Sequence, residues 1–154
     1  MEKSLPPKPS FSEVNKYLNK WKNLEGYTSQ ERALNKLFIE LLPGNSEITD
    51  ILLKASCLND FYSTRIFAIY PVAKRILSIK DLDKRLKAGD IKLVRELGNV
   101  KIGGNKRYFY SFATKYCSHH NPIAFPIYDS YVEKVLLYFN KIDKFSSFKK
   151  ADLK

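Results

Sequence analysis

Apolar residues recur at helical spacing along most of the chain, and polar or turn-forming residues separate one stretch from the next. Ser10, followed three residues later by Glu13, is typical of a helix start, because each side chain can bond to the backbone N–H of the other residue. The apolar spacing after this pair predicts a first helix from Phe11 to about Gly26. Further helices are predicted over residues 28–42, 48–55, 60–76, 81–88, 90–97, 106–118 and 130–139.

Breaks in this pattern predict how the helices are joined. Pro71 lies inside the predicted helix 60–76 and is expected to kink or end it, since proline lacks a backbone N–H. Residues 99–105 contain two adjacent glycines and predict a tight turn, while residues 119–122 predict a polar loop. No stretch alternates apolar and polar residues as a half-buried strand does. The predicted fold class is therefore all-α, a compact array of about eight short helices.

The chain has 154 residues, which suits one domain with one core. Residues 1–10 are rich in proline and predict an extended leader, and residues 11–140 predict a single helical domain. Residues 141–154 form a lysine-rich C-terminal segment that either aids solubility or begins a further helix. No internal repeat indicates a solenoid or a propeller.

Composition excludes several classes of protein. Hydrophobic residues make up 44% of the chain and charged residues 28%, which is typical of a folded protein. The longest uncharged apolar run, Ile66 to Ala73, is far short of the roughly 20 residues that cross a bilayer, and residues 1–9 lack the apolar stretch of a signal peptide, so none is expected there. We therefore expect a cytoplasmic monomer with no membrane partner. Cys57 and Cys117 are expected to be reduced, packed thiols, and no metal or other cofactor is expected.

Positive charge is concentrated in one part of the chain. Lys and Arg number 27 against 16 Asp and Glu, a net charge of +11. Between residues 91 and 128 there are several basic residues but a single acid, Glu96, and this region is also rich in aromatic residues. Cations neutralise phosphates, and flat rings can stack on an unpaired base. The combination predicts a nucleic-acid partner.

Two groups of residues within this region are candidates for contact. Tyr108 and Tyr110 fall off the helical stripe of Phe109, Phe112 and Tyr116, which we expect in the core. Backbone N–H groups of adjacent glycines beside cations, just before a helix, could hold a phosphate. The predicted DNA-binding residues are Lys101, Gly103, Gly104, Asn105, Lys106, Arg107 and Lys115. The alternatives are an ordinary two-glycine turn and a solvated lysine face.

Residues 121–136 read Asn-Pro-Ile-Ala-Phe-Pro-Ile-Tyr-Asp-Ser-Tyr-Val-Glu-Lys-Val-Leu. This stretch resembles the Pro-Val-Asp-Thr-His-Val-x-Arg-Val-Leu signature of the helix-hairpin-helix DNA glycosylases, the endonuclease III-like superfamily. A weaker resemblance extends from about Glu31 to Phe139. The resemblance implies a helix-hairpin-helix glycosylase-like fold, double-stranded DNA as the partner, a role in base excision repair, and Asp129 at the position of the catalytic aspartate.

Three departures from the family pattern limit what the resemblance implies. The hairpin Ile102-Gly103-Gly104-Asn105-Lys106-Arg107 differs in spacing from the family's Leu-Pro-Gly-x-Gly-x-Lys, so its grip on phosphate is in doubt. Ser111 stands where bifunctional members have a Schiff-base lysine, so no lyase activity is expected. The two cysteines cannot supply the family's four-cysteine iron–sulfur loop.

The chemistry that the resemblance implies depends on one carboxylate. Asp129 would stabilise the positive charge that develops on the sugar as an N-glycosidic bond breaks, and would activate the attacking water. A base pocket or a wedge side chain is also needed, and its candidates are Asn59, Tyr62, Tyr128 and Tyr131. The alternative for Asp129 is a plain helix N-cap, which is compatible with catalysis. His119 and His120 are expected in a solvated loop, with phosphate contact as the second reading and zinc as the third.

These observations leave three hypotheses. The first is a DNA-binding protein of the glycosylase type, a monofunctional hydrolase that uses Asp129 to activate water. The second is a non-catalytic helical module that binds nucleic acid on the same scaffold. The third is a basic adaptor for an acidic protein surface.

Overall fold

The structure is a computed structural model that describes residues 6–150. Internal contacts divide the chain into two units, residues 1–33 and residues 34–154, and each is described by itself. The elements within the described residues are α1 (Phe11–Lys22), α2 (Glu25–Asn35), a π-helical turn η1 (Lys36–Leu41), α3 (Ile48–Phe61), α4 (Ile69–Leu77), α5 (Leu82–Ala88), α6 (Lys92–Gly98), β1 (Asn99–Ile102), β2 (Asn105–Tyr108), α7 (Tyr110–His120) and α8 (Ser130–Asp143).

Helix α1 begins as predicted, because the hydroxyl of Ser10 accepts a hydrogen bond from the backbone N–H of Glu13 at 3.2 Å. The predicted boundary between the first two helices is wrong. Helix α1 ends at Lys22, and α2 already begins at Glu25. Thr28 therefore lies inside α2, where its hydroxyl bonds back to backbone carbonyls of the preceding turn instead of capping a new helix.

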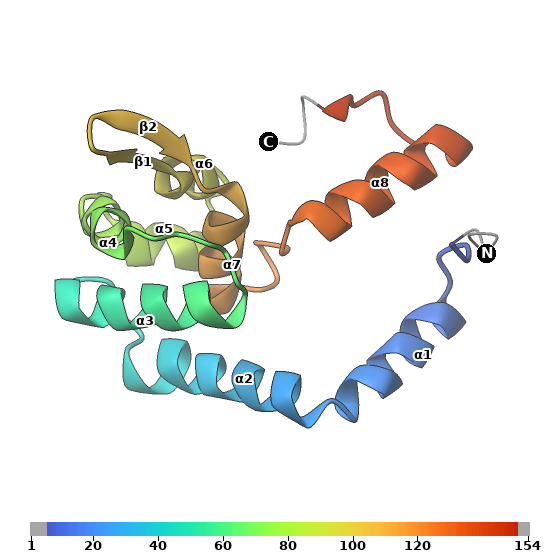
Figure 1. The fold of residues 1–154 in the computed structure, drawn as a ribbon, viewed down its shortest axis with the longest axis horizontal. Coiled ribbons are helices and arrows are strands. Elements are labelled where there is room, and N and C mark those ends of the chain that lie inside the picture. Colours follow the sequence, from blue (N-terminus) through green and yellow to red (C-terminus); the bar gives the residue numbers. More distant parts are fainter. Residues whose placement is uncertain (1–5, 151–154) are drawn as a thin grey trace. The chain divides into compact units, whose positions relative to one another are not determined.

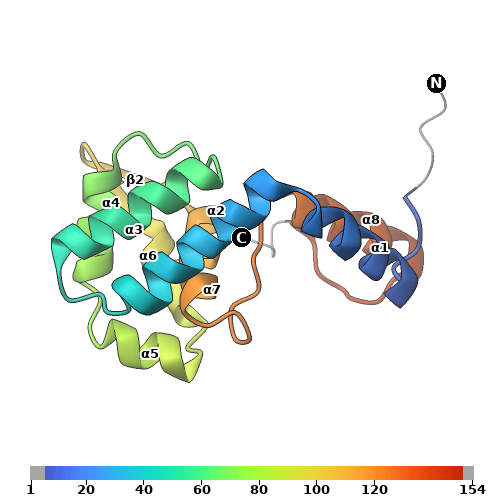
Figure 2. The same cartoon turned by 90° about the horizontal axis from the view of Figure 1, so that it is seen from below.

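The core of the second unit lies among α3, α4, α6 and α7, with Phe38 of η1 packed against them. Figure 1 shows α3 beside α4, and Figure 2 shows the same pair from below. Phe112 and Tyr116 of α7 are fully buried, which confirms their predicted core position, while Phe109 is partly buried against the same core. Both cysteines are free thiols, and burial raises the pKa of the Cys117 thiol to about 12. The core thus positions α7, which carries several candidate site residues.

The predicted helix 60–76 is wrong in its limits. Helix α3 continues to Phe61, and α4 begins only at Ile69. Pro71 is therefore the third residue of α4, where a missing N–H costs no helical hydrogen bond, so it neither kinks nor ends the helix.

The prediction that strands are absent is also wrong. Strands β1 and β2 pair antiparallel, with Ile102 opposite Asn105, so Gly103 and Gly104 are the two-residue loop of a β-hairpin (Figure 1). Both glycines have positive φ values, 55° and 82°, as a tight turn of the mirror-image type requires. Strand β2 separates these glycines from α7, so their N–H groups do not lie at the start of a helix.

Most of the described residues are helical, so the predicted all-α class is confirmed apart from this two-stranded hairpin. The domain limits at residues 10 and 140 stay a prediction. Within residues 6–150, no helix is long and apolar enough to cross a membrane.

Candidate nucleic-acid interface

Asp129 caps helix α8 and keeps one carboxylate oxygen accessible to other partners. Its Oδ1 accepts hydrogen bonds from the backbone N–H groups of Tyr131 and Val132, at 3.0 and 3.1 Å, which confirms the predicted N-cap. Its Oδ2 lies 3.5 Å from the ammonium of Lys115, and 29% of the Asp129 side chain is exposed. Burial alone would raise the pKa of Asp129, but the two N–H groups and the Lys115 ammonium outweigh burial and hold that pKa below its usual value. Asp129 is therefore an ionised carboxylate at neutral pH.

Lys115 does not lie on the surface, where a phosphate contact would place it. Its side chain is only 4% exposed. Its Nζ donates to the hydroxyl of Ser111 at 2.8 Å and lies 5.2 Å from the ring centre of Tyr62. Burial lowers the pKa of Lys115, and the charge of Asp129 partly opposes that shift. Because Ser111 precedes Lys115 by one helical turn, α7 brings both groups to the same point beside Asp129.

Asp129 and Ser111 line a surface cleft of about 310 Å³. The ring of Tyr110 makes edge-to-face contacts with two other rings. Its centre lies 5.6 Å from that of Tyr108 and 5.2 Å from that of Tyr128. Three aromatic rings therefore form one continuous wall. The residues that line the cleft are Tyr108, Tyr110, Ser111, Tyr128, Asp129, Ser130 and Glu133.

Three exposed cations of the hairpin, Lys101, Lys106 and Arg107, form no ion pair with any acid that the structure describes. We call them the hairpin cations. The acid expected to offset charge here, Glu96, is held by Arg85 in a two-pronged ion pair instead. Tyr108 is the last residue of β2 and also lines the cleft, so the strand that carries Lys106 and Arg107 ends at the cleft that contains Asp129.

The remaining predicted base-pocket residues differ in their placement. Tyr128 lines the cleft, and Tyr62 lies against Lys115 behind it. The side chain of Asn59 is bonded to the loop before α4, because it accepts a hydrogen bond from the N–H of Ile66 and donates one to the carbonyl of Ile66. Tyr131 is 75% exposed on α8 and lines none of the cavities described here. The structure thus brings Tyr62 and Tyr128 to the site, and it does not bring Asn59 or Tyr131.

The prediction that His119 and His120 lie in a solvated loop is wrong. Both belong to the last turn of α7, His119 is buried, and both rings pack against Phe38. Burial lowers the pKa of His119 to about 4 and that of His120 to about 3, so both rings are neutral at physiological pH. Within residues 6–150, no three His, Cys, Asp or Glu side chains gather closely enough to hold a metal ion.

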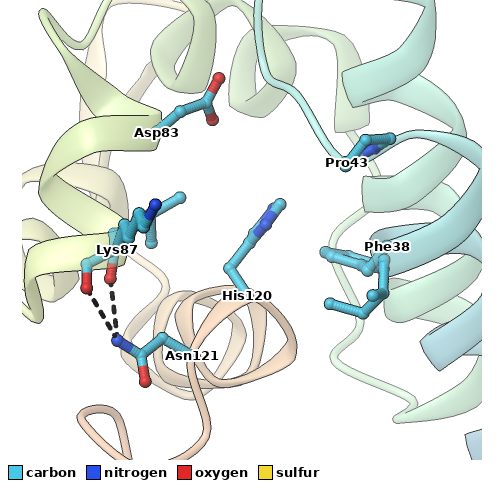
Figure 3. A pocket seen from close by; sticks show the side chains of 8 residues that line it. Phe38, Pro43, Asp83, Lys87, His120 and Asn121 are labelled. Atoms are coloured by element: carbon cyan, nitrogen blue, oxygen red, sulfur yellow. Dashed lines mark hydrogen bonds between the residues drawn. The ribbon is translucent and has the colours of Figure 1, made fainter.

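A second cavity, of about 320 Å³, lies between η1, α5 and the end of α7. Figure 3 shows Asp83, His120 and Phe38 around it, with the Asn121 amide bonded to backbone carbonyls of α5. The carboxylate of Asp83 in its lining already accepts hydrogen bonds from the backbone N–H and the side-chain amide of Asn45, which does not line the cavity. These hydrogen bonds stabilise the cavity wall and leave the Asp83 carboxylate less able to bind a ligand.

Sequence reasoning missed the fully buried Lys54 behind this second cavity. Its Nζ donates to the carbonyl of Gly44 at 2.7 Å and to the side chain of Asn45 at 2.8 Å. Tyr116 donates to the same Asn45 oxygen. A signal existed in the sequence, because Lys54 stands on the apolar stripe of α3, three residues after Ile51.

Comparison with known proteins gives a family but no activity. The family model HI_0787_N, described as an N-terminal domain, matches residues 13–124. A protein of Haemophilus influenzae (strain ATCC 51907 / DSM 11121 / KW20 / Rd), named only "Uncharacterized protein", is 74% identical over 107 residues. That alignment covers 70% of this chain and 53% of the relative, so the chain spans about half the length of the curated relative it matches. No solved structure matches the chain.

Proposed function

The chain belongs to the HI_0787_N N-terminal domain family, and from the geometry of its own residues we propose that it is a DNA-binding protein that excises a base. The observation that carries the proposal is the ionised Asp129 in a tyrosine-lined cleft, one wall of which is Tyr108, the residue that ends the strand bearing Lys106 and Arg107. The substrate is double-stranded DNA, the reaction is hydrolysis of an N-glycosidic bond, and the location is the cytoplasm. The resemblance of residues 121–136 to the helix-hairpin-helix glycosylases supports the same scaffold.

The hairpin supplies the binding step. Its cations attract the phosphate backbone of DNA, and their binding releases the counterions that were condensed on the DNA. The turn of two glycines is narrow, with no atom within 4 Å of where a side chain would begin at either residue. A duplex backbone can therefore come close to the turn without a steric clash. Tyr108 and Tyr110, at the foot of the hairpin, offer rings to an unstacked base.

Asp129 supplies the chemical step. As the N-glycosidic bond breaks, the base leaves with the bonding electron pair and takes up a proton from solvent. The Oδ2 of Asp129 stabilises the positive charge on the sugar and accepts a proton from the water that adds to C1′. The two N–H bonds to Oδ1 fix the carboxylate, and Lys115 keeps it ionised. No covalent bond to the protein is needed, which fits a monofunctional hydrolase.

One observation favours the second candidate, a module that binds nucleic acid without catalysis. Asp129 already has three partners within the protein, so water competes for its Oδ2 with the Lys115 ammonium. If that ion pair does not open when DNA binds, the carboxylate serves only as a cap.

Substitution of Asp129 by asparagine separates these candidates. Asparagine caps helices about as well as aspartate, so Asp129→Asn removes the charge and keeps α8. Asp143→Asn, at the other end of α8, is the matched control. Each protein is mixed with duplexes that carry modified bases, and alkali-labile abasic sites and binding are measured at low salt.

The three outcomes have distinct meanings. Abasic sites formed by wild type and Asp143→Asn, but not by Asp129→Asn, support the glycosylase. Binding by all three proteins without abasic sites refutes catalysis and supports the module. Failure of wild type to bind duplex DNA at low salt, where attraction to phosphate is strongest, refutes both and leaves an adaptor for acidic proteins.

A further inference from the structure

A third cavity, of about 510 Å³, lies behind the tyrosine wall of the Asp129 cleft. Most of its lining is apolar or aromatic and comes from α6, the end of β2, α7, the following loop and α8. The lining residues on which the argument rests are Val94, Arg95, Tyr108, Tyr110, Thr114 and Phe125. We call it the Arg95 cavity. Its volume and its mainly apolar lining, with a few polar groups, are typical of small-molecule sites, which span about 300–1,000 Å³.

The wall of the Arg95 cavity is held in place by hydrogen bonds and close packing. The hydroxyl of Thr114 lies 3.0 Å from the carbonyl of Tyr128 and accepts the Tyr128 N–H at 3.2 Å, which fixes the loop before α8. The ring of Tyr108 packs closely against Gly98 at the end of α6, where an added methyl group would come within 2.8 Å of it. Phe125 is buried in the core and closes the base of the loop. The cavity is therefore preformed, which reduces the entropy cost of binding.

Arg95 is the one charged residue in the lining of this cavity. Its guanidinium makes no hydrogen bond or ion pair with any residue among 6–150. The neighbouring acids are not available, because Arg85 holds both Asp90 and Glu96. An unpaired guanidinium at the edge of an apolar cavity favours an anionic group on the ligand.

We propose that the Arg95 cavity binds a planar aromatic anion. The ring lies against Tyr108 and Tyr110, and the carboxylate or phosphate of the ligand pairs with Arg95. Two sources share this chemistry, a free small molecule and the phosphorylated terminal nucleotide of a strand. The proposal does not depend on DNA excision, since Asp129 does not line this cavity.

Calorimetric titration of the full chain with 2-naphthoate, and with the neutral 2-naphthalenemethanol, tests the proposal. Arg95→Gln should weaken binding of naphthoate at least about tenfold, since a charge-assisted bond is lost, and should leave the alcohol unaffected. Lys92→Gln is the matched control, because Lys92 is exposed on the same helix and does not line the cavity. Gly98→Ala should weaken both ligands, because it displaces Tyr108.

Two further ligands distinguish the sources. If thymidine 5′-monophosphate binds as tightly as a 5′-phosphorylated oligothymidine, the natural ligand is a free small molecule. Tighter binding of the oligonucleotide, lost in Arg95→Gln and kept in Lys92→Gln, supports a strand terminus. No measurable binding of naphthoate or thymidine monophosphate to wild type, or equal loss in the two glutamine variants, overturns the proposal.

Discussion

Substitution of the buried Lys54 by methionine should remove a specific pH dependence of stability. The side chain of Lys54 is fully buried in α3, and its ammonium has only neutral oxygen acceptors. Burial lowers the pKa of Lys54 from 10.5 to about 8, although the charges of Asp83 and Asp50 act in the opposite direction. The folded protein therefore gives up this proton more readily than the unfolded chain does.

The size and the sign of the change in the free energy of unfolding follow from the difference between the Lys54 pKa in the folded protein and in the unfolded chain. A shift from 10.5 to about 8, at about 1.36 kcal/mol for each pKa unit, corresponds to about 3 kcal/mol. Below pH 8 the lysine is charged in both states, and the cost of burying the charge is fully present. Between pH 8 and pH 10.5 the unfolded chain holds more protons, so the free energy of unfolding rises with pH. Above pH 10.5 the cost is absent.

Urea unfolding at several pH values between 7 and 10.5, followed by circular dichroism, measures this dependence. Taking the difference between wild type and Lys54→Met cancels the titration of the other lysines and the tyrosines. Lys74→Met, an exposed lysine on α4, is the matched control and should follow wild type. Parallel pH curves for wild type and Lys54→Met would refute the reasoning, because they would mean that the ammonium is not desolvated.

Three other substitutions test the fold and the site. Gly89→Ala should lower the free energy of unfolding by about 1–2 kcal/mol in urea, because Gly89 has a left-handed φ of 71° and its added methyl would crowd Ala124. Asp129→Ala should lower it by about 1 kcal/mol more than Asp129→Asn does, since both variants leave Lys115 without its counter-charge and only alanine also loses the cap. Changing all three hairpin cations to glutamine should weaken duplex binding and reduce the slope of log K against log salt by up to about 3, as a salt titration would measure. An unchanged slope would place the phosphate contacts elsewhere.

The periodicity of apolar residues predicted those parts of the fold that local spacing determines. It identified α5 and α6 close to their limits, the starts of α1 and α8, and Asp129 as the cap of α8. The hairpin was missed because each strand has only four residues and β2 is exposed along its whole length. Alternation cannot show in so short and so exposed a segment.

The site depends on contacts that no local pattern contains. Lys115 is buried because Asp129, fourteen residues later in the chain, supplies its counter-charge. Lys54 is buried because the side-chain oxygen of Asn45, from the loop before α3, accepts a hydrogen bond from its ammonium. Lysine is normally a surface residue, so its burial can be inferred only when the tertiary partner is known.

The most direct test of the account is a nuclear magnetic resonance titration of the 154-residue chain with a short duplex at low salt. If the hairpin cations and the Asp129 cleft form one surface that faces DNA, backbone amide signals of the hairpin, of the start of α7 and of the N-terminal turn of α8 should shift together at the same DNA concentration. Shifts of the hairpin without those around Asp129, or shifts confined to other helices, would contradict the account.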